Sequence, residues 1–228
     1  MCGIAGYFGN KPLDKTNIKS CLDLMKKRGP DNSDFFYQKY NKLNVYLLHS
    51  RLSIIDLKEQ SNQPFEDEGY IVVFNGEIYN YLELKKKLQN LGHNFKTLSD
   101  TEVLLKSYIQ YGEKCVDHFN GMWAFVILDK KKGSLFISRD RFGEKPLYFY
   151  KNDKEFFFGS EIKFIKKLIN QKLEINKKKI FRSLNLGYRA VHQSQETYFN
   201  SIYSLKSGSN ITIQKNLKLK KKYIGNQS

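Results

Sequence analysis

The sequence has few of the residues and segments that mark secreted, metal-binding or membrane-spanning proteins. Its 228 residues include three cysteines, Cys2, Cys21 and Cys115, whose odd number and unrelated spacings favour neither a disulfide framework nor a zinc site. We therefore expect no bound metal. No apolar run approaches the ~18 residues of a membrane-spanning helix, and the first residues lack the basic and apolar segments of a signal peptide. We expect a soluble, cytoplasmic protein with no membrane partner.

Acidic residues are scarce relative to basic ones. The chain has 23 Asp and Glu residues against 39 Lys and Arg residues, which gives a formal net charge of +16. Such a charge would suit a nucleic-acid ligand. However, arginine is scarce, and the lysines lie in short runs spread along the chain, on the polar faces of predicted helices or in turns. We interpret the charge as a solvated surface and expect no nucleic-acid partner.

The spacing of the apolar residues predicts an α+β fold. Helical periodicity is present over residues 18–25, 80–91, 99–111, 161–168 and 178–184. Strand patterns are present over residues 4–8, 35–40, 45–51, 70–74, 123–128, 135–138, 146–150 and 155–158. Because the strands form antiparallel hairpins interrupted by helices, and do not alternate with them, we expect sheets covered by helices. We place one domain over residues 1–215 and a lysine-rich tail over 216–228, which we expect to fray.

Capping signals set the starts of two of the predicted helices. Asn80 and Glu83 have the spacing of a capping box, with Leu84, Leu88 and Leu91 expected to face inward. Ser99 and Glu102 form a second such pair. The run over residues 70–74 is apolar throughout, which predicts a strand covered on both faces.

Cys2 follows the initiator Met1 directly. If Met1 is removed, which a small second residue favours, Cys2 carries a thiol and a free α-amine on one carbon. The thiol has a pKa of about 8.5 and the α-amine one of about 7.7 to 8.0, so the amine can accept the thiol proton directly or through one water. Cys2 is therefore a candidate nucleophile that carries its own base.

Other segments offer groups that suit one small ligand. Arg51 ends an apolar strand, where its planar guanidinium can clamp a carboxylate. The Asn75 amide and the Gly76 N–H, which follow the strand over 70–74, offer two donors to one oxygen, as an oxyanion hole requires. Asp100 offers a charge for an ammonium. Each alone is typical of a surface ion pair, a turn or a helix start, but together with Cys2 they describe a receptor for an amino acid that ends in a carboxamide.

Six segments, in order along the chain, resemble the glutaminase domain of glutamine-hydrolysing asparagine synthetases. They cover residues 2–6, 28–31, 49–56, 75–80, 99–102 and 139–148. The resemblance places the chain among the class II, N-terminal-nucleophile glutamine amidotransferases. It implies that residues 1–215 form a four-layer αββα sandwich of the N-terminal-nucleophile hydrolase type.

The same resemblance assigns roles to residues of this sequence. It implies that Cys2 is the nucleophile and that Asn75 and Gly76 form the oxyanion hole. Arg51 then holds the α-carboxylate of L-glutamine and Asp100 holds its α-ammonium. The remaining residues expected to line the substrate pocket are Leu52, Ser53, Ile54, Ile55 and Glu77.

The implied reaction is hydrolysis of L-glutamine to glutamate and ammonia through a glutamyl thioester. No segment of the 228-residue sequence matches the Ser-Gly-Gly-x-Asp phosphate loop of the family's ATP-dependent synthetase domain. We expect no cofactor in this chain, and assign Mg-ATP to a synthetase domain or subunit outside these residues. Two other functions are left open: a non-catalytic glutamine-binding or partner-binding module, and another N-terminal-nucleophile amidase. The amide acceptor could also be a compound other than aspartate, such as a sugar. The chain could form a homodimer.

Overall fold

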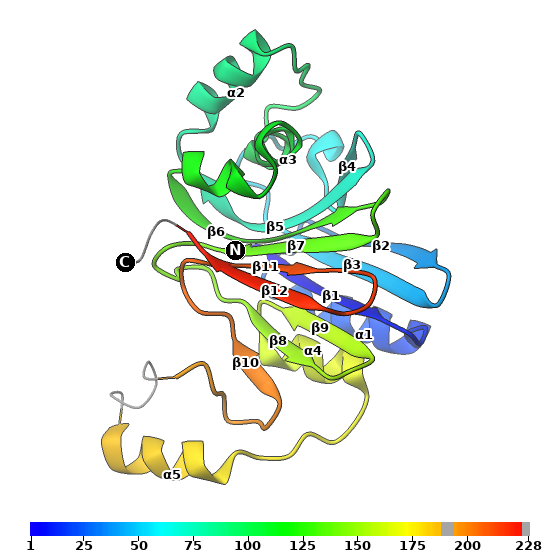
Figure 1. The fold of residues 1–228 in the computed structure, drawn as a ribbon, viewed down its shortest axis with the longest axis vertical. Helices are drawn as coiled ribbons and strands as arrows, with labels where there is room; N and C mark the ends of the chain where they lie inside the picture. The colour runs from blue at the N-terminus through cyan, green and yellow to red at the C-terminus, as the bar shows by residue number, and fades with distance from the viewer. Residues whose placement is uncertain (188–193, 225–228) are drawn as a thin grey trace.

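Two antiparallel sheets lie face to face in the computed structural model, which describes residues 1–187 and 194–224 (Figure 1). Sheet A has the strand order β10-β8-β9-β1-β3-β2 and sheet B the order β12-β11-β7-β6-β5-β4. The strands of sheet A are β1 (Gly3–Gly9), β2 (Asn32–Tyr40), β3 (Leu43–Arg51), β8 (Tyr148–Lys151), β9 (Glu155–Gly159) and β10 (Ile202–Ser204). The strands of sheet B are β4 (Phe65–Asp67), β5 (Tyr70–Ile78), β6 (Gly121–Asp129), β7 (Ser134–Arg139), β11 (Ser209–Ile213) and β12 (Leu219–Tyr223).

Helices cover the outer faces of both sheets (Figure 1). Sheet A packs against α1 (Lys15–Met25) and α4 (Ile162–Ile169), and sheet B against α2 (Tyr81–Asn90) and α3 (Asp100–Tyr111). The helix α5 (Lys177–Leu186) and the short helices η1 (Glu59–Ser61) and η2 (Gly112–His118) complete the described helices. This is the four-layer αββα arrangement that the resemblance implied, and the α+β prediction is confirmed.

Alternation along the central strands fills three separate apolar layers. Ile4 and Phe8 of β1 contribute to the core between the sheets, whereas Tyr7 packs toward α1 and α4. On β5, Val73 faces the core between the sheets and Phe74 faces α2 and α3. The continuous apolar run in β5 is therefore buried on both sides, as predicted.

The strand β5 is longer than the sequence pattern indicated. We expected Asn75 and Gly76 to follow the strand, because the apolar run ends at Phe74 and an Asn-Gly pair alone is typical of a turn. Instead β5 stays paired with β6 from Tyr70–Asp129 to Ile78–Gly121. Asn75 and Gly76 thus lie within β5, where they pair with Ala124 and Trp123 of β6.

One of the two predicted capping boxes is wrong. Asn80 makes no side-chain cap; its Oδ1 accepts from Asn120 N at 2.9 Å and its Nδ2 donates to His118 O at 3.0 Å. It therefore connects the start of α2 to the end of η2 and the residues that follow it. Leu91 lies beyond the end of α2 and is 54% exposed, in contrast to the inward orientation expected.

The second predicted box forms only in part. Ser99 caps α3 by accepting from Thr101 N at 3.1 Å. The Glu102 carboxylate does not return to the Ser99 N–H and accepts instead from Thr97 N at 2.7 Å. The side chain of Glu102 therefore fixes the loop before α3.

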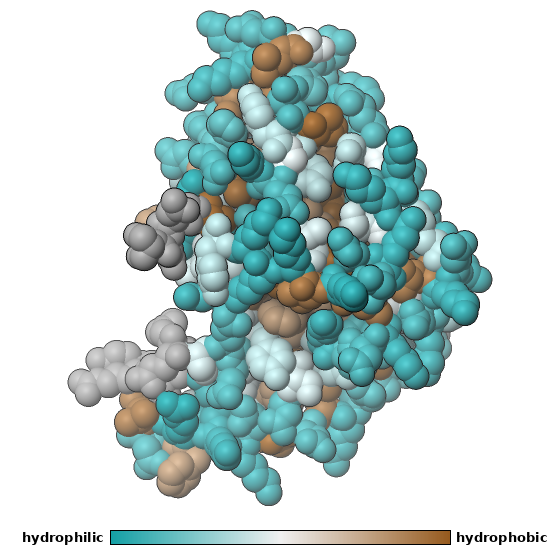
Figure 2. Space-filling view, viewed as in Figure 1, coloured by the Kyte–Doolittle hydropathy of each residue, from teal (hydrophilic) through white to brown (hydrophobic). Residues whose placement is uncertain are grey.

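The expected fraying after residue 216 is wrong for the part of the tail that the structure describes. The strand β12 pairs with β11 from Ser209–Tyr223 to Ile213–Leu219. Leu217 and Ile224 are buried at its two ends, and Lys222 forms a 2.7 Å ion pair with Glu113. Figure 2 shows mostly hydrophilic side chains on the face that carries β12, and lysines on an edge strand oppose pairing with other chains. The division of domains at 215 and 216 stays a prediction.

Candidate active site

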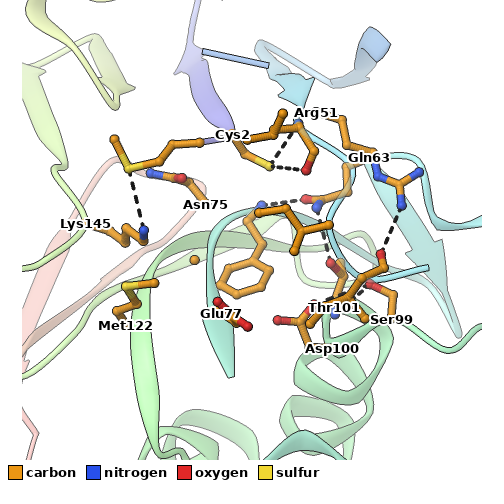
Figure 3. Close-up of a pocket in the computed structure, with 16 residues that line it drawn as sticks. Cys2, Arg51, Gln63, Asn75, Glu77, Ser99, Asp100, Thr101, Met122 and Lys145 are labelled. Carbon is orange, nitrogen blue, oxygen red and sulfur yellow. Dashed lines mark hydrogen bonds between the residues drawn. The ribbon is translucent and has the colours of Figure 1, made fainter. Parts of the chain in front are cut away.

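A pocket of about 80 Å³ lies where the start of β1 in sheet A meets β5 of sheet B and the N-terminal end of α3 (Figure 3). Of the residues predicted from the sequence, its lining includes Cys2, Arg51, Leu52, Ile54, Ile55, Asn75, Gly76, Glu77 and Asp100. These residues come from four separate segments of the chain. The fold therefore brings the predicted nucleophile, oxyanion donors and charged groups to one cavity.

Ser53 is the predicted residue that does not line the pocket. Its backbone N–H donates to Asp31 Oδ2 at 2.6 Å. Asp31 belongs to the Arg-Gly-Pro-Asp turn that follows α1, so this bond fastens the segment after β3 to that turn. The structure thus gives Ser53 a contact that supports the pocket wall from outside.

Cys2 directly precedes β1, and its sulfur is tied to the segment that follows β3. The Leu52 N–H donates to Cys2 Sγ at 3.4 Å, and Sγ lies 3.7 Å from Leu52 O. Burial raises the pKa of the Cys2 thiol, whereas the Leu52 N–H, the N-terminal ammonium and Arg51 act to lower it. Since the net effect is upward, the thiol is protonated at neutral pH and needs a base to become a nucleophile.

Met1 also lines this pocket. Its sulfur accepts from Lys145 Nζ at 3.6 Å, and its ammonium donates to Arg28 O at 3.1 Å. With Met1 in place, the nitrogen of Cys2 is an amide and has no basicity. Removal of Met1 would enlarge the pocket and convert that nitrogen into an amine beside the thiol.

Asn75 presents an unused hydrogen-bond donor to the pocket. The residue is 1% exposed, and its Nδ2 has no hydrogen-bond partner among the described residues. A buried amide donor without a partner costs free energy, and a ligand oxygen would satisfy it. Gly76, the next residue, also lines the pocket, and a Cβ there would come within 2.2 Å of Met122 O. Only glycine fits between β5 and β6 at this position.

Arg51 is buried, and its terminal nitrogens bond the loop after β3. One nitrogen donates to Lys58 O at 3.0 Å and to Asn62 Oδ1 at 2.8 Å. The other donates to Ile55 O at 3.4 Å and to Asp56 O. Arg51 thus orders the loop that forms one wall of the pocket. To clamp a carboxylate with both terminal nitrogens it would have to exchange some of these bonds, so that role stays a prediction.

Asp100, the first residue of α3, is one of two acidic residues in the pocket lining, the other being Glu77. The Asp100 Oδ2 accepts from Ile78 N at 3.0 Å, which links α3 to the end of β5. Burial, assisted by nearby Glu77, raises the pKa of this carboxyl to about 6, against the lowering effect of the Ile78 bond. A ligand ammonium placed here would supply the missing positive charge and favour the ionised form.

Several lining residues escaped the sequence reasoning. They are Met1, Gln63, Phe74, Ser99, Thr101, Met122 and Lys145. Of these, Ser99, Thr101 and Lys145 could have been found from the sequence, because they lie in the segments 99–102 and 139–148 that carry the resemblance. The carboxylate of Asp140 accepts from the N–H groups of Phe142, Glu144 and Lys145 at 3.0 Å each, and this rigid turn directs Lys145 to the pocket.

Residues 1–187 and 194–224 contain no group of three or more His, Cys, Asp or Glu side chains that could hold a metal ion. In the same residues, no helix is long and apolar enough to cross a membrane. The pocket lining itself presents a thiol, an amide, carboxylates and cationic side chains.

Comparison with known proteins agrees with this geometry. A family model described as a glutamine amidotransferase domain matches residues 1–224. The chain belongs to this family. It is 45% identical over 208 residues to a putative glutamine-hydrolysing asparagine synthetase of Methanocaldococcus jannaschii, covering 82% of this chain and 40% of that protein. It is 36% identical over 221 residues to glutamine-hydrolysing asparagine synthetase 1 of Bacillus subtilis, covering 94% and 34%.

The fold is shared with a more distant amidotransferase. Glutamine phosphoribosylpyrophosphate amidotransferase from B. subtilis superposes with a TM-score of 0.70, at 16% identity, over 97% of this chain and 49% of that chain. The resemblance to glutaminase domains of asparagine synthetases and to their type of sandwich is thereby confirmed. The amidotransferase domain spans less than half the length of these curated relatives.

Proposed function

We propose that this amidotransferase domain hydrolyses L-glutamine to glutamate and ammonia, with Cys2 as the nucleophile after removal of Met1. The observation that carries the proposal is the buried Asn75 Nδ2, which has no partner among the described residues and lines the same pocket as the Cys2 sulfur. A thiol beside an unused amide donor suits attack on a carbonyl followed by stabilisation of the resulting oxyanion.

The reaction would proceed in two stages. The α-amine of Cys2 takes the thiol proton, and the sulfur attacks the side-chain carbonyl carbon of glutamine. The oxyanion then accepts hydrogen bonds from Asn75 Nδ2 and the Gly76 N–H. Collapse of this intermediate breaks the carbon–nitrogen bond, and the amine returns its proton to the departing ammonia. Water then attacks the glutamyl thioester and releases glutamate and the thiol.

Selectivity for a free amino acid would come from the two charged sides of the pocket. Arg51 supplies the positive charge for the α-carboxylate, and Asp100 supplies the negative charge for the α-ammonium. A peptide-linked glutamine has neither charge at its α-position. We therefore expect L-glutamine to be hydrolysed in preference to an N-acylated glutamine amide.

The direct test is glutamate release from L-glutamine by the purified protein. Cys2→Ala removes the sulfur and is expected to abolish turnover, and Cys2→Ser is expected to do the same because its alkoxide forms far less readily. Cys21→Ala is the matched control, since Cys21 is buried against α4 and away from the pocket. Undiminished activity in Cys2→Ala would refute the assignment. A folded wild-type protein that binds glutamine without turnover would favour the non-catalytic alternative.

We further propose that the domain acts as the glutaminase part of an amidotransferase of the asparagine synthetase type, whose ATP-dependent half lies outside these residues. The 36–45% identity to glutamine-hydrolysing asparagine synthetases supports this proposal. An exposed apolar face on α5 also supports it, with Phe181 69% and Leu184 80% exposed. Sedimentation with and without a separately produced synthetase half tests the pairing, and self-association by the chain alone would favour the homodimer.

A further inference from the structure

The backbone of Phe74, the residue directly before Asn75, is held by two side chains from other parts of the fold. Its N–H donates to Gln63 Oε1 at 2.7 Å, and its carbonyl oxygen lies 3.1 Å from His49 Nε2. The neighbouring strand β4 pairs with β5 from Asp67–Tyr70 to Phe65–Val72. Beyond Val72, these two side chains satisfy the peptide groups of Phe74 and fix the course of β5 toward the pocket.

His49 connects the two sheets at this point. His49 lies on β3 and is fully buried. It pairs with Ile4 of β1, and Ile4 is two residues after Cys2 in the sequence. Since its partner is a carbonyl oxygen, we assign the proton to Nε2 and leave Nδ1 as an acceptor. Burial lowers the pKa of His49 to about 3, so the ring is neutral at physiological pH. The imidazole therefore acts as a fixed hydrogen-bond donor and not as a titrating group.

The other ring nitrogen of His49, Nδ1, lowers the stability of the folded protein. It is buried and has no hydrogen-bond partner within the described residues. A buried acceptor left unsatisfied disfavours the folded state, and an apolar side chain of similar size would avoid that loss. The bond from Nε2 to Phe74 gives the residue a role that an apolar side chain could not fill.

We infer that His49 is a positioning residue that sets the Asn75 carboxamide relative to the Cys2 sulfur. This inference rests on the proposed function. The bond joins the sheet that carries the nucleophile to the strand that carries the oxyanion donor, one residue before that donor. An oxyanion hole works only when its donors lie about 2.7 to 3.1 Å from the developing charge. A displacement of about 1 Å can lower the rate by about 10²-fold.

Two substitutions separate the hydrogen bond from the size and polarity of the ring. In His49→Gln the side-chain amide nitrogen reaches about as far as Nε2, so the bond to Phe74 O is retained. In His49→Asn the shorter side chain is polar but does not reach that oxygen. We expect His49→Asn to lower kcat for glutamine hydrolysis by about 10-fold or more with KM little changed, and His49→Gln to keep most of the wild-type kcat.

A double-mutant cycle with Asn75→Ala tests whether the effect acts through Asn75. If His49 only positions the Asn75 amide, adding His49→Asn to Asn75→Ala should change kcat by less than about 2-fold. Thr197→Val is the control for loss of a buried side-chain bond, because Thr197 Oγ1 donates to the carbonyl oxygen of Ile202, the first residue of β10, at 2.8 Å. It should leave kcat unchanged. Melting curves of all variants verify that each is folded.

The outcomes distinguish this inference from the function on which it rests. If the wild-type protein does not turn over glutamine, the proposed function fails. If it does, equal kcat values in His49→Asn and the wild type overturn the positioning role. The role is also overturned if His49→Gln is folded yet as slow as His49→Asn, or if the two losses in the double mutant simply multiply. Should His49→Asn not fold, a slow but folded His49→Gln would still refute it.

Discussion

The sulfur of Cys2 lies 3.4 Å from the backbone nitrogen of Leu52, fifty residues further along the chain. This contact joins the start of β1 to the end of β3, which are neighbours in sheet A with Gly3 opposite Ser50. The antiparallel register therefore places the thiol beside the first residue after β3. An N–H directed at sulfur also favours the thiolate, so the same contact positions the nucleophile and assists its ionisation.

Activity is expected to require a free Cys2 amine. A version with an uncleaved N-terminal tag before Cys2 should fold and yet show no glutamine hydrolysis, because the tag converts the amine into an amide with no basicity. Cleavage with a protease that leaves Cys2 as the first residue should restore turnover. Mass spectrometry of the untagged active protein should show that Met1 is absent. Full activity with the tag in place would mean that another group accepts the thiol proton.

Asn75→Ala and Arg51→Ala are expected to alter different kinetic constants. Asn75→Ala should lower kcat by about 10²- to 10³-fold, because an oxyanion donor acts mainly in the transition state. Arg51→Ala should mainly raise KM, because a carboxylate clamp binds ground and transition states alike. Steady-state kinetics on both variants decide the roles. Equal effects on both constants in the two variants would show that the roles are wrongly assigned.

The structure adds a stability effect for one of these variants. Arg51 donates to the carbonyls of Lys58 and Ile55, so its removal leaves oxygen atoms of the pocket wall without their donors. We expect Arg51→Ala to melt at a lower temperature than Asn75→Ala. The Asn75 Nδ2 has no partner to lose within the described residues.

Most of the pocket could be predicted from the sequence because its polar residues lie in short, ordered motifs. Cys2, Arg51, Asn75 and Asp100 were each predicted from their residue type and local setting, and the fold places them around one cavity. The contribution of Phe74 could not be seen, because it acts through its peptide N–H and carbonyl groups. Those groups are the same in every residue, and only the tertiary structure shows what bonds them.

The errors of prediction came from local signals that tertiary pairing overrode. The Asn-Gly pair at 75 and 76 indicated a turn, but nine residues of ladder with β6 keep the strand continuous. The lysines of 218–222 indicated a solvated tail, but buried Leu217 and Ile224 hold both ends of β12. In both cases, long-range contacts outweigh the preference of the individual residues.

Nucleotide binding is not expected from this 228-residue chain. Its sequence contains no Ser-Gly-Gly-x-Asp phosphate loop, and Ser207-Gly208-Ser209 lacks both the second glycine and the aspartate. Titration with Mg-ATP in a calorimeter should show no saturable heat, and aspartate, ammonia and Mg-ATP should yield no asparagine. Glutamine added to the same sample should produce heat, which serves as the positive control. Saturable micromolar binding of Mg-ATP would reveal a nucleotide site and require a new interpretation of the lysine-rich C-terminal region.

Asp100 is expected to make glutamine recognition sensitive to mild acid. Its carboxyl has a pKa raised to about 6, so it is ionised at pH 8 and becomes protonated as the pH falls through 6. Protonation removes the charge that would hold the α-ammonium, so kcat/KM for glutamine should fall below about pH 6, mainly through a rise in KM. The plot of kcat/KM against pH for the wild-type protein tests this.

Asp100→Asn separates the charge of this residue from its structural bond. The amide oxygen can still accept from Ile78 N, so β5 and α3 should stay connected. We expect a high KM at every pH and loss of the change near pH 6. Because the folded state raises the pKa of Asp100 above its ordinary value of 3.8, ionisation of this group lowers stability as the pH rises through that range. Asp100→Asn should therefore melt at a higher temperature than the wild type above pH 6, and a lower melting temperature there would contradict the burial argument.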